Sequence, residues 1–237
     1  MDFHLNEEQR IIQETVRKFS EKELAPKAGE IDEKELFPKE GWLKLSELGL
    51  AGLLTDAKYG GMGLDSTTLV LFMVELAKGC LATAGTYSVN TTVQFIIQTF
   101  CSEEQKEELL PTLSSGERIG ALAITEPNAG SDISSMITQA VLNDAGYILS
   151  GNKIFITSGE VADLYIVFAK TDKASKHRGI SALIVEKGTP GFTFGKKEKK
   201  MGYRGSPTVE LVFDSCKIPS TNLIKAEGEG FNIVMSA

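Results

Sequence analysis

The chain has 237 residues, of which 42% are hydrophobic and 24% charged, which is the composition of a folded globular protein. A formal net charge of −7 argues against nucleic acid as the main partner, and no apolar stretch is long enough to predict a membrane span. Three cysteines and two histidines lie scattered, without the spacing of a metal site or a catalytic triad. We therefore expect buried, reduced thiols and no metal.

Residues 1–118 show helical spacing of their apolar side chains and predict an N-terminal helical bundle. Asn6 and Gln9 form a capping-box pattern at the start of the first helix, which we expect to end near Pro26. A second helix is expected over 38–48, between a proline suited to a first turn and a glycine that stops the helix.

Three further helices follow the loop YGGMG at residues 59–63. The stretch TTLVLFMVELAKG, which Asp65 can cap, is apolar nearly all round and predicts a helix buried on most sides. The next stretch, 81–100, combines small and apolar residues. Ser102 and Gln105 then form a second capping box and open the last helix of this half.

After Gly116 the pattern changes to short runs rich in Ile, Val, Tyr and Phe, separated by Gly, Asn, Asp and Pro. These runs predict a middle β-domain over 119–224, built as an antiparallel barrel or sandwich because no helical crossover intervenes. The predicted fold class is therefore α+β.

Residues 225–237 begin a further helical pattern of apolar residues, which continues for only a few residues. We interpret them as the start of a truncated C-terminal helical domain and the chain as a fragment. A naturally short protein with one docked helical turn is the alternative interpretation.

The stretch ALAITEPNAGSD, residues 121–132, is the first candidate binding segment. An apolar run that can end a strand stops at Pro127 and is followed by residues able to turn sharply. Gly130 permits close approach, Ser131 offers a hydroxyl, and successive backbone N–H groups can form a nest for a polar ligand. An ordinary strand-to-turn corner is the alternative.

The stretch KIFITSG, residues 153–159, is the second candidate. Alternation along a strand places Phe155 and Thr157 on one face and Ile154 and Ile156 on the other. A ring and a hydroxyl on the same face can meet a flat heterocycle together, by stacking and by a hydrogen bond. A core phenylalanine beside a strand-forming threonine is the alternative.

Five motifs occur in order along the chain: YGGMG, ITEPNAGSD, LSGNKIFITSG, GFTFGKKEKKMGYRGSPTVELVFDSCKIP and GEGFNIVMS. Together they resemble the acyl-CoA dehydrogenase family, and most closely its short-chain, butyryl-type bacterial members. The resemblance covers essentially the whole chain. It implies an N-terminal helical domain, a middle β-domain and the first turns of a third, helical domain.

The resemblance also implies which residues bind FAD and the acyl-CoA substrate. Thr157 would hydrogen-bond the flavin near N5, and Phe155 would pack on the ring where many members carry Trp. Ser131 would lie where flavin and thioester meet. The implied cofactor-binding residues are Leu122, Ala123, Ile124, Thr125, Gly130, Ser131, Phe155, Ile156 and Thr157, and the implied substrate-binding residues are Ser131, Gly85 and Ser88.

The implied reaction is FAD-dependent α,β-dehydrogenation of a short-chain acyl-CoA to the 2-enoyl-CoA, with electrons passed to an electron-transferring flavoprotein. In this family the catalytic glutamate lies in the C-terminal helical domain, so no catalytic residue is assigned here, and Glu126 is left as part of the corner. The resemblance further implies a homotetramer, located in the bacterial cytoplasm or an organelle matrix.

Three alternatives stay open. An acyl-CoA oxidase of the same fold would pass the electrons to oxygen, and a non-catalytic binding or assembly module would keep the fold without the activity. The basic run at residues 195–205 could attract the CoA phosphates, or it could be an ordinary solvated loop.

Overall fold

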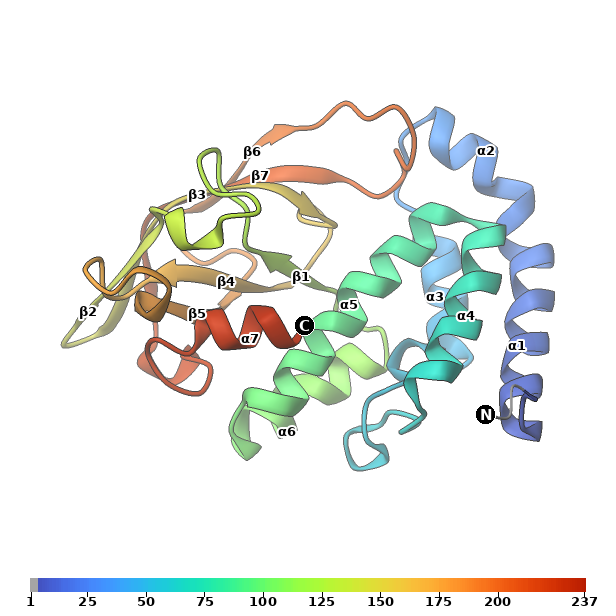
Figure 1. Cartoon of the computed structure of the whole chain (residues 1–237). Coiled ribbons are helices and arrows are strands. Elements are labelled where there is room, and N and C mark those ends of the chain that lie inside the picture. Colours follow the sequence, from blue (N-terminus) through green and yellow to red (C-terminus); the bar gives the residue numbers. More distant parts are fainter. Residues whose placement is uncertain (1–3) are drawn as a thin grey trace.

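The computed structural model describes residues 4–237, with the helices of residues 7–114 gathered at one end of the molecule and a curled sheet, together with the last helix, at the other (Figure 1). The α-helices are α1 (Glu7–Phe19), α2 (Ala25–Glu33), α3 (Lys39–Glu47), α4 (Ser66–Gly79), α5 (Leu81–Phe100), α6 (Glu103–Ser114) and α7 (Gly230–Ser236). A π-helical turn, Ser20–Leu24, joins α1 to α2.

The expected end of the first helix near Pro26 is wrong. The helical path continues through the π turn into α2 and ends only at Glu33. Pro26 lies within the first two positions of α2, directly after the π turn, so the hydrogen bond that its missing N–H cannot make falls at the junction of the two helical segments. The wider π turn lets the chain restart its hydrogen bonding there.

The other predicted helix boundaries are confirmed. Both capping boxes form: the Asn6 side chain accepts from Gln9 N, and the Ser102 side chain accepts from Gln105 N. Asp65 caps α4 by accepting from Thr68 N at 2.7 Å. The helix expected over 38–48 is α3, and Gly49 follows it with φ of +72°, a left-handed conformation that glycine adopts readily.

Helix α4 is less buried than its composition predicted. Val70 and Val74 are 61% and 47% exposed, whereas Phe72 and Leu76 are fully buried. The buried residues of α4 recur at helical spacing, so one face packs inward and an apolar face remains open. A helix that is apolar on nearly every side is therefore buried here on one face only.

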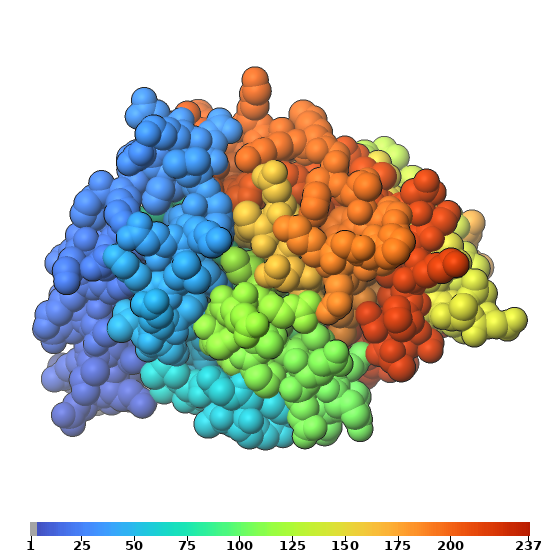
Figure 2. All heavy atoms as spheres, turned by 180° about the vertical axis from the view of Figure 1, so that it is seen from behind, coloured from blue at the N-terminus to red at the C-terminus, as the bar shows by residue number. Residues whose placement is uncertain are grey.

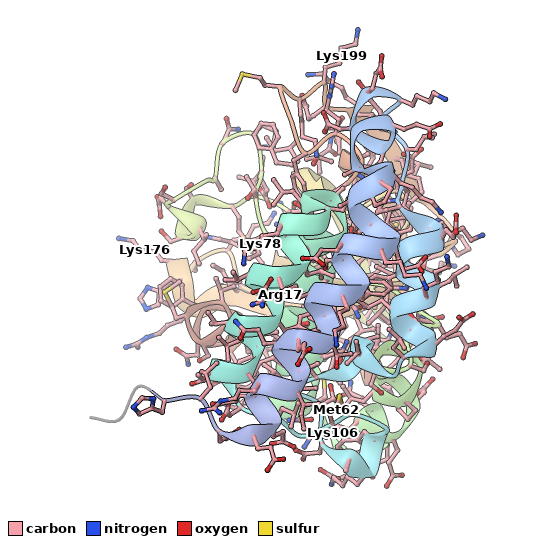
Figure 3. All side chains as sticks on the ribbon, turned by 90° about the vertical axis from the view of Figure 1, so that its right-hand side faces the viewer. Arg17, Met62, Lys78, Lys106, Lys176 and Lys199 are labelled. Carbon is pink, nitrogen blue, oxygen red and sulfur yellow. The ribbon has the colours of Figure 1, made fainter. Side chains whose placement is uncertain are left out.

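Buried Glu75 ties α4 to α1 on the inner face. Arg17 donates to its carboxylate from Nε and from a terminal guanidinium nitrogen, and Lys78 lies 3.0 Å from the same group. Figure 3 shows Arg17 and Lys78 meeting from the two helices. The hydrogen bond from Arg17 holds the pKa of Glu75 below its ordinary value against the opposing effect of burial.

The strands form one mixed sheet in the order β1-β4-β2-β3-β7-β6, with β5 paired to β4. They are β1 (Gly120–Ala123), β2 (Gln139–Asn143), β3 (Gly146–Thr157), β4 (Leu164–Lys170), β5 (Ile180–Glu186), β6 (Phe192–Lys197) and β7 (Thr208–Ile218). Most neighbours are antiparallel, as predicted, but β1 pairs with β4 in parallel, and β2 joins β4 by one parallel pair.

The parallel pairing corrects the expectation of a purely antiparallel domain. A parallel pair needs a long connection, which is usually a helix. Along the chain, the β2–β3 hairpin comes between β1 and β4 and serves as the long connection. The absence of a helical crossover therefore did not exclude parallel strands.

The helical and β halves share their hydrophobic core. One buried cluster contains Phe72 and Tyr87 of the helices together with Leu149 and Leu211 of the sheet. Buried Asn90 on α5 accepts from Gly120 N at 2.9 Å, at the first residue of β1. Seen from behind, α6 lies between the blue helices and the orange and red β half (Figure 2).

Candidate functional site

The segment after β1 forms a tight corner. Glu126 and Ala129 exchange backbone hydrogen bonds of 2.9 and 3.1 Å and close the turn around Pro127. Gly130 and Ser131 follow on the exposed side, and a β-carbon placed on Gly130 would meet no atom within 4 Å. The corner thus presents small residues to open space, which leaves room for a ligand to approach the backbone.

The end of β3 is bulged at Phe155. Its φ of +59° lies in the left-handed region, and the pairing with β7 shifts register between Lys153 and Ile156. Phe155 is 56% exposed, whereas Ile156 is 2% exposed. The bulge interrupts the regular alternation that we expected across residues 154–157, because one extra residue enters this strand. It leaves an aromatic ring at the surface next to half-buried Thr157.

The corner and the bulged strand lie side by side. Ile154 N donates to Thr125 O at 2.8 Å, so the candidate residues of the two segments are joined by the backbone. Within residues 4–237 the hydroxyls of Thr125 and Thr157 make no hydrogen bond. Two unengaged hydroxyls and one exposed ring therefore lie on two segments that the hydrogen bond from Ile154 N joins, and Gly130 is open on the loop that follows the corner.

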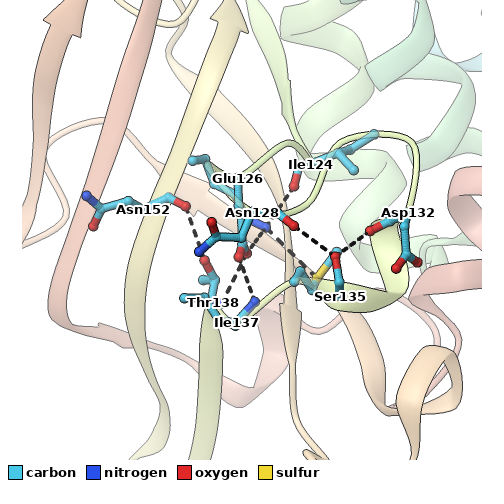
Figure 4. Close-up of polar contacts among 10 residues, drawn as sticks. Ile124, Glu126, Asn128, Asp132, Ser135, Ile137, Thr138 and Asn152 are labelled. Carbon is cyan, nitrogen blue, oxygen red and sulfur yellow. Dashed lines mark hydrogen bonds and ion pairs between the residues drawn. The ribbon is translucent and has the colours of Figure 1, made fainter.

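The corner also contains a buried ion pair, and Figure 4 shows Glu126 among the polar contacts of the corner. Lys153 Nζ lies 2.7 Å from Glu126 Oε1, and neither side chain is more than 1% exposed. Lys153 also donates to Ile124 O at 2.9 Å, while the Glu126 carboxylate accepts from Ile137 N and Thr138 N. Sequence reasoning missed Lys153; the only signal was a lysine directly before the apolar run Ile154–Ile156.

Both charges of this pair persist near neutral pH. Burial alone would raise the pKa of Glu126, but the charge of Lys153 and the hydrogen bonds from Ile137 and Thr138 outweigh burial and hold that pKa below its ordinary value. Burial lowers the pKa of Lys153 to about 8, against the opposing attraction of Glu126. A carboxylate engaged in this way cannot serve as a general base without losing its partners.

Two cavities flank helix α7. Ser131 lines one of about 350 Å³ together with His177, Phe231 and Met235. Ser88 lines another of about 230 Å³, between α4, α5 and the last two residues of the chain. The structure therefore places the predicted substrate residues Ser131 and Ser88 in different cavities, both bordered by α7.

Gly85, the third predicted substrate residue, is covered by a side chain from the β half. A β-carbon on Gly85 would lie 1.4 Å from Tyr203 Oη and 2.1 Å from its ring carbon Cζ. Tyr203 has a φ of +59° and comes from the basic run at 195–205. Sequence reasoning missed this contact because the two residues are far apart in the chain.

Most of the basic run has local partners. Arg204 lies 2.7 Å from Asp32 of α2, and Lys197 lies 3.2 Å from Glu160. Lys200 donates to Ser206 O and lies over the Tyr203 ring. The Arg204 contact docks the run onto the helical half, and together these contacts leave few free charges for a phosphate.

Other chemistry has little support in the described part of the chain. Across residues 4–237 no group of three metal-binding side chains comes together. Cys80, Cys101 and Cys216 are buried and unpaired, as predicted. No helix in the same range combines the length and hydropathy needed to cross a membrane.

Family comparison accounts for nearly the whole chain. The model of the acyl-CoA dehydrogenase N-terminal domain matches residues 6–117, and that of the acyl-CoA dehydrogenase middle domain matches residues 121–216. The chain belongs to the acyl-CoA dehydrogenase family, with the helical half and the curled sheet as its first two domains.

Individual relatives agree with this assignment. The chain is 44% identical over 99% of its length to a short-chain-specific acyl-CoA dehydrogenase of Clostridium acetobutylicum, of which it covers 62%. It also matches the structure of butyryl-CoA dehydrogenase from Megasphaera elsdenii, at 46% identity and a TM-score of 0.95 over 100% of this chain and 63% of that one.

Two further solved structures concern flavins. A chain solved in work on the electron transferring flavoprotein of Acidaminococcus fermentans is 46% identical, with a TM-score of 0.96, over 99% of this chain and 62% of that one. The FAD complex of PigA is 33% identical, with a TM-score of 0.94, over 100% and 62%. The chain thus spans somewhat less than two thirds of the length of these relatives.

Proposed function

We propose that this chain forms the cofactor-holding part of an FAD-dependent acyl-CoA dehydrogenase that converts short-chain acyl-CoA to the 2-enoyl-CoA. The observation that carries the proposal is the meeting of the Thr125 corner with the Phe155 bulge, joined by the 2.8 Å hydrogen bond from Ile154 N to Thr125 O. Membership of the family and the short-chain-specific relative support the substrate class.

The residues at this place fit a flavin ring. The unengaged hydroxyls of Thr125 and Thr157 would hydrogen-bond its polar edge, the exposed ring of Phe155 would pack on its face, and Gly130 would allow close approach. When bound, FAD would accept the two electrons that leave the substrate. We further propose that Leu122, Ala123, Ile124, Ser131 and Ile156 complete the cofactor-binding set.

The acyl chain would lie against α5. Ser88 lines the cavity of about 230 Å³, and Gly85 lies one turn earlier on the same helix. Tyr203 already occupies the space that a side chain at position 85 would take. The short-chain-specific relative supports a short acyl chain.

We propose that the group removing the α-proton lies outside these 237 residues. Glu126, the carboxylate at the corner, is 2% exposed and engaged by Lys153, Ile137 and Thr138. The chain also spans only 62% of its short-chain-specific relative. Ser131 would face the thioester from the exposed side of the corner.

The same proposal includes a partner, an assembly and a location. An electron-transferring flavoprotein would receive the electrons, in line with the structural match from that system. As is typical of the family, the protein would form a homotetramer and would be located in the bacterial cytoplasm or an organelle matrix. The open apolar face of α4, with Val70 and Val74, is one surface that further chain or another subunit could cover.

The test uses the protein produced from its whole gene. We expect a yellow protein with one FAD per chain that reduces an electron-acceptor dye with butyryl-CoA faster than with octanoyl-CoA. A protein that stays colourless with added FAD, or that reduces the dye with neither substrate, would contradict the proposal. Steady dye-free consumption of oxygen would favour an oxidase instead.

A further inference from the structure

The ion pair of Glu126 and Lys153 is the most completely buried charged contact in the described part of the chain. Removing two charges from water costs several kcal/mol per ion in effective terms, so a buried pair is weak evidence for stability alone. The backbone groups that hydrogen-bond to the pair indicate its role better than the pair itself does. Each of them belongs to the corner at residues 124–126 or to the end of the loop at residues 137–138.

On the lysine side, two successive residues of β3 hold two successive carbonyl groups of the corner. Lys153 Nζ donates to Ile124 O at 2.9 Å, and Ile154 N donates to Thr125 O at 2.8 Å. The side chain and backbone of one strand therefore fix the position of Thr125 relative to Phe155, which follows directly.

On the glutamate side, the carboxylate anchors the far end of the loop. It accepts from Ile137 N at 2.6 Å and from Thr138 N at 3.1 Å, while the backbone of Glu126 pairs with Ala129. The loop that carries Gly130 and Ser131 thus leaves from and returns to the same side chain (Figure 4).

The loop between these anchors is packed at both ends and exposed at its tip: Ala129 and Met136 are buried, and Ile133 packs against the same core. Gly130, Ser131 and Asp132 are exposed, and a β-carbon on Gly130 would contact nothing. Apolar packing therefore holds the ends of the loop, and the directional polar contacts of Glu126 add a constraint on its exposed tip.

We propose that Glu126 and Lys153 are positioning residues for FAD: through the Ile124 carbonyl and the Ile137 and Thr138 amides they hold the corner and the Phe155 bulge at the spacing that one flavin ring requires. This inference rests on the proposed function. Neither side chain reaches the open side itself, so the pair acts through Thr125, Phe155 and Thr157.

The decisive variant is the double substitution Glu126→Gln with Lys153→Met in the whole gene product. It removes both buried charges together, which often leaves stability nearly unchanged, but it leaves the Ile124 carbonyl without its donor. We expect the FAD dissociation constant to rise about 10-fold or more, with a changed visible circular dichroism of the bound flavin. The melting temperature of the apoprotein should fall only modestly, because the cost of the unpaired Ile124 carbonyl is partly offset by the removal of two buried charges.

A matched control is Glu14→Gln with Lys18→Met, which removes an exposed ion pair of the same 2.7 Å length from α1. Its FAD affinity should equal that of the unaltered protein. If the Glu126/Lys153 double variant folds and binds FAD within twofold of the unaltered protein, the pair has no positioning role.

If the double variant does not fold, hydrogen exchange on the unaltered protein decides. FAD should increase protection at Ile154 and, through the carboxylate, at Ile137 and Thr138 together. Protection at Ile154 without any change at Ile137 and Thr138 would overturn the inference. Failure of the proposed function looks different, because the unaltered protein would then not bind FAD at all.

Discussion

Close glycine contacts decide how individual residues tolerate substitution. A β-carbon on Gly52 would lie 2.5 Å from Ser114 Cβ and 2.9 Å from its Cα, whereas on Gly85 it would meet the movable ring of Tyr203. We expect Gly52→Ala to lower the free energy of unfolding by about 2–3 kcal/mol and Gly85→Ala by about 1 kcal/mol, both measured by urea denaturation.

Gly29 provides the control for these two substitutions. It lies inside α2, and a β-carbon there would meet no atom within 4 Å. Gly29→Ala should raise the free energy of unfolding by up to about 1 kcal/mol, because alanine favours the helix. Equal losses at all three glycines would contradict the contacts described.

Glu126 should make the protein sensitive to acid. Its pKa in the folded protein lies below its ordinary value, so its contribution to stability is complete above the unfolded pKa of about 4.5 and is lost as pH falls through the folded pKa. Thermal melting between pH 6 and pH 3 should show a shallower decline for Glu126→Gln than for the unaltered protein, after allowance for other carboxylates. Parallel declines would contradict this assignment.

At this scale the sequence predicted the corner but not its support. Thr125, Gly130 and Ser131 were visible as a strand end followed by small residues. Lys153 was hidden because period-2 alternation cannot show that a charged side chain is buried, and the partner, Glu126, lies 27 positions away. The left-handed Phe155 was equally hidden, since a bulge depends on the neighbouring strand.

Helix α6 illustrates how one element serves two parts of the molecule. Ser102 and Gln105 complete its capping box, and Gln105 Nε2 also donates to Thr221 O at 2.7 Å and Leu223 O at 3.2 Å. Ser102→Ala should lower the free energy of unfolding by about 1 kcal/mol, measured by urea denaturation. Gln105→Ala should lower it by about 2 kcal/mol, because the contacts with Thr221 and Leu223 are lost as well.

Ser102→Asp is the matched control for the cap, because aspartate accepts the same backbone hydrogen bond and should leave stability nearly unchanged. If Gln105→Ala proves no more costly than Ser102→Ala, the contacts with Thr221 and Leu223 contribute nothing measurable.

Elements with local signals were predicted well, and those that depend on distant contacts were not. The capping boxes and Gly49 lie beside the helices that they bound, so the sequence shows them directly. The π turn at 20–24 has no local signature. The parallel pairing of β1 with β4 depends on the path of the intervening hairpin, which composition does not record.

At the scale of the whole molecule, the shared core predicts a single unfolding transition. Trp42, the one tryptophan of the chain, lies in the helical half and donates to Gly116 O at 2.9 Å, while Asn90 joins α5 to β1. Tryptophan fluorescence and far-ultraviolet circular dichroism should therefore give the same urea midpoint. Two separated midpoints would show that the halves unfold independently.

Complete burial of Lys153 also gives the protein an internal chemical reporter. Amine-acylating reagents will modify the surface lysines first and leave this one untouched while the corner stays closed. Because burial is what lowers its pKa, the amine returns to the reactivity of an ordinary lysine once it is uncovered. The rate at which position 153 becomes labelled would then measure how often the corner opens.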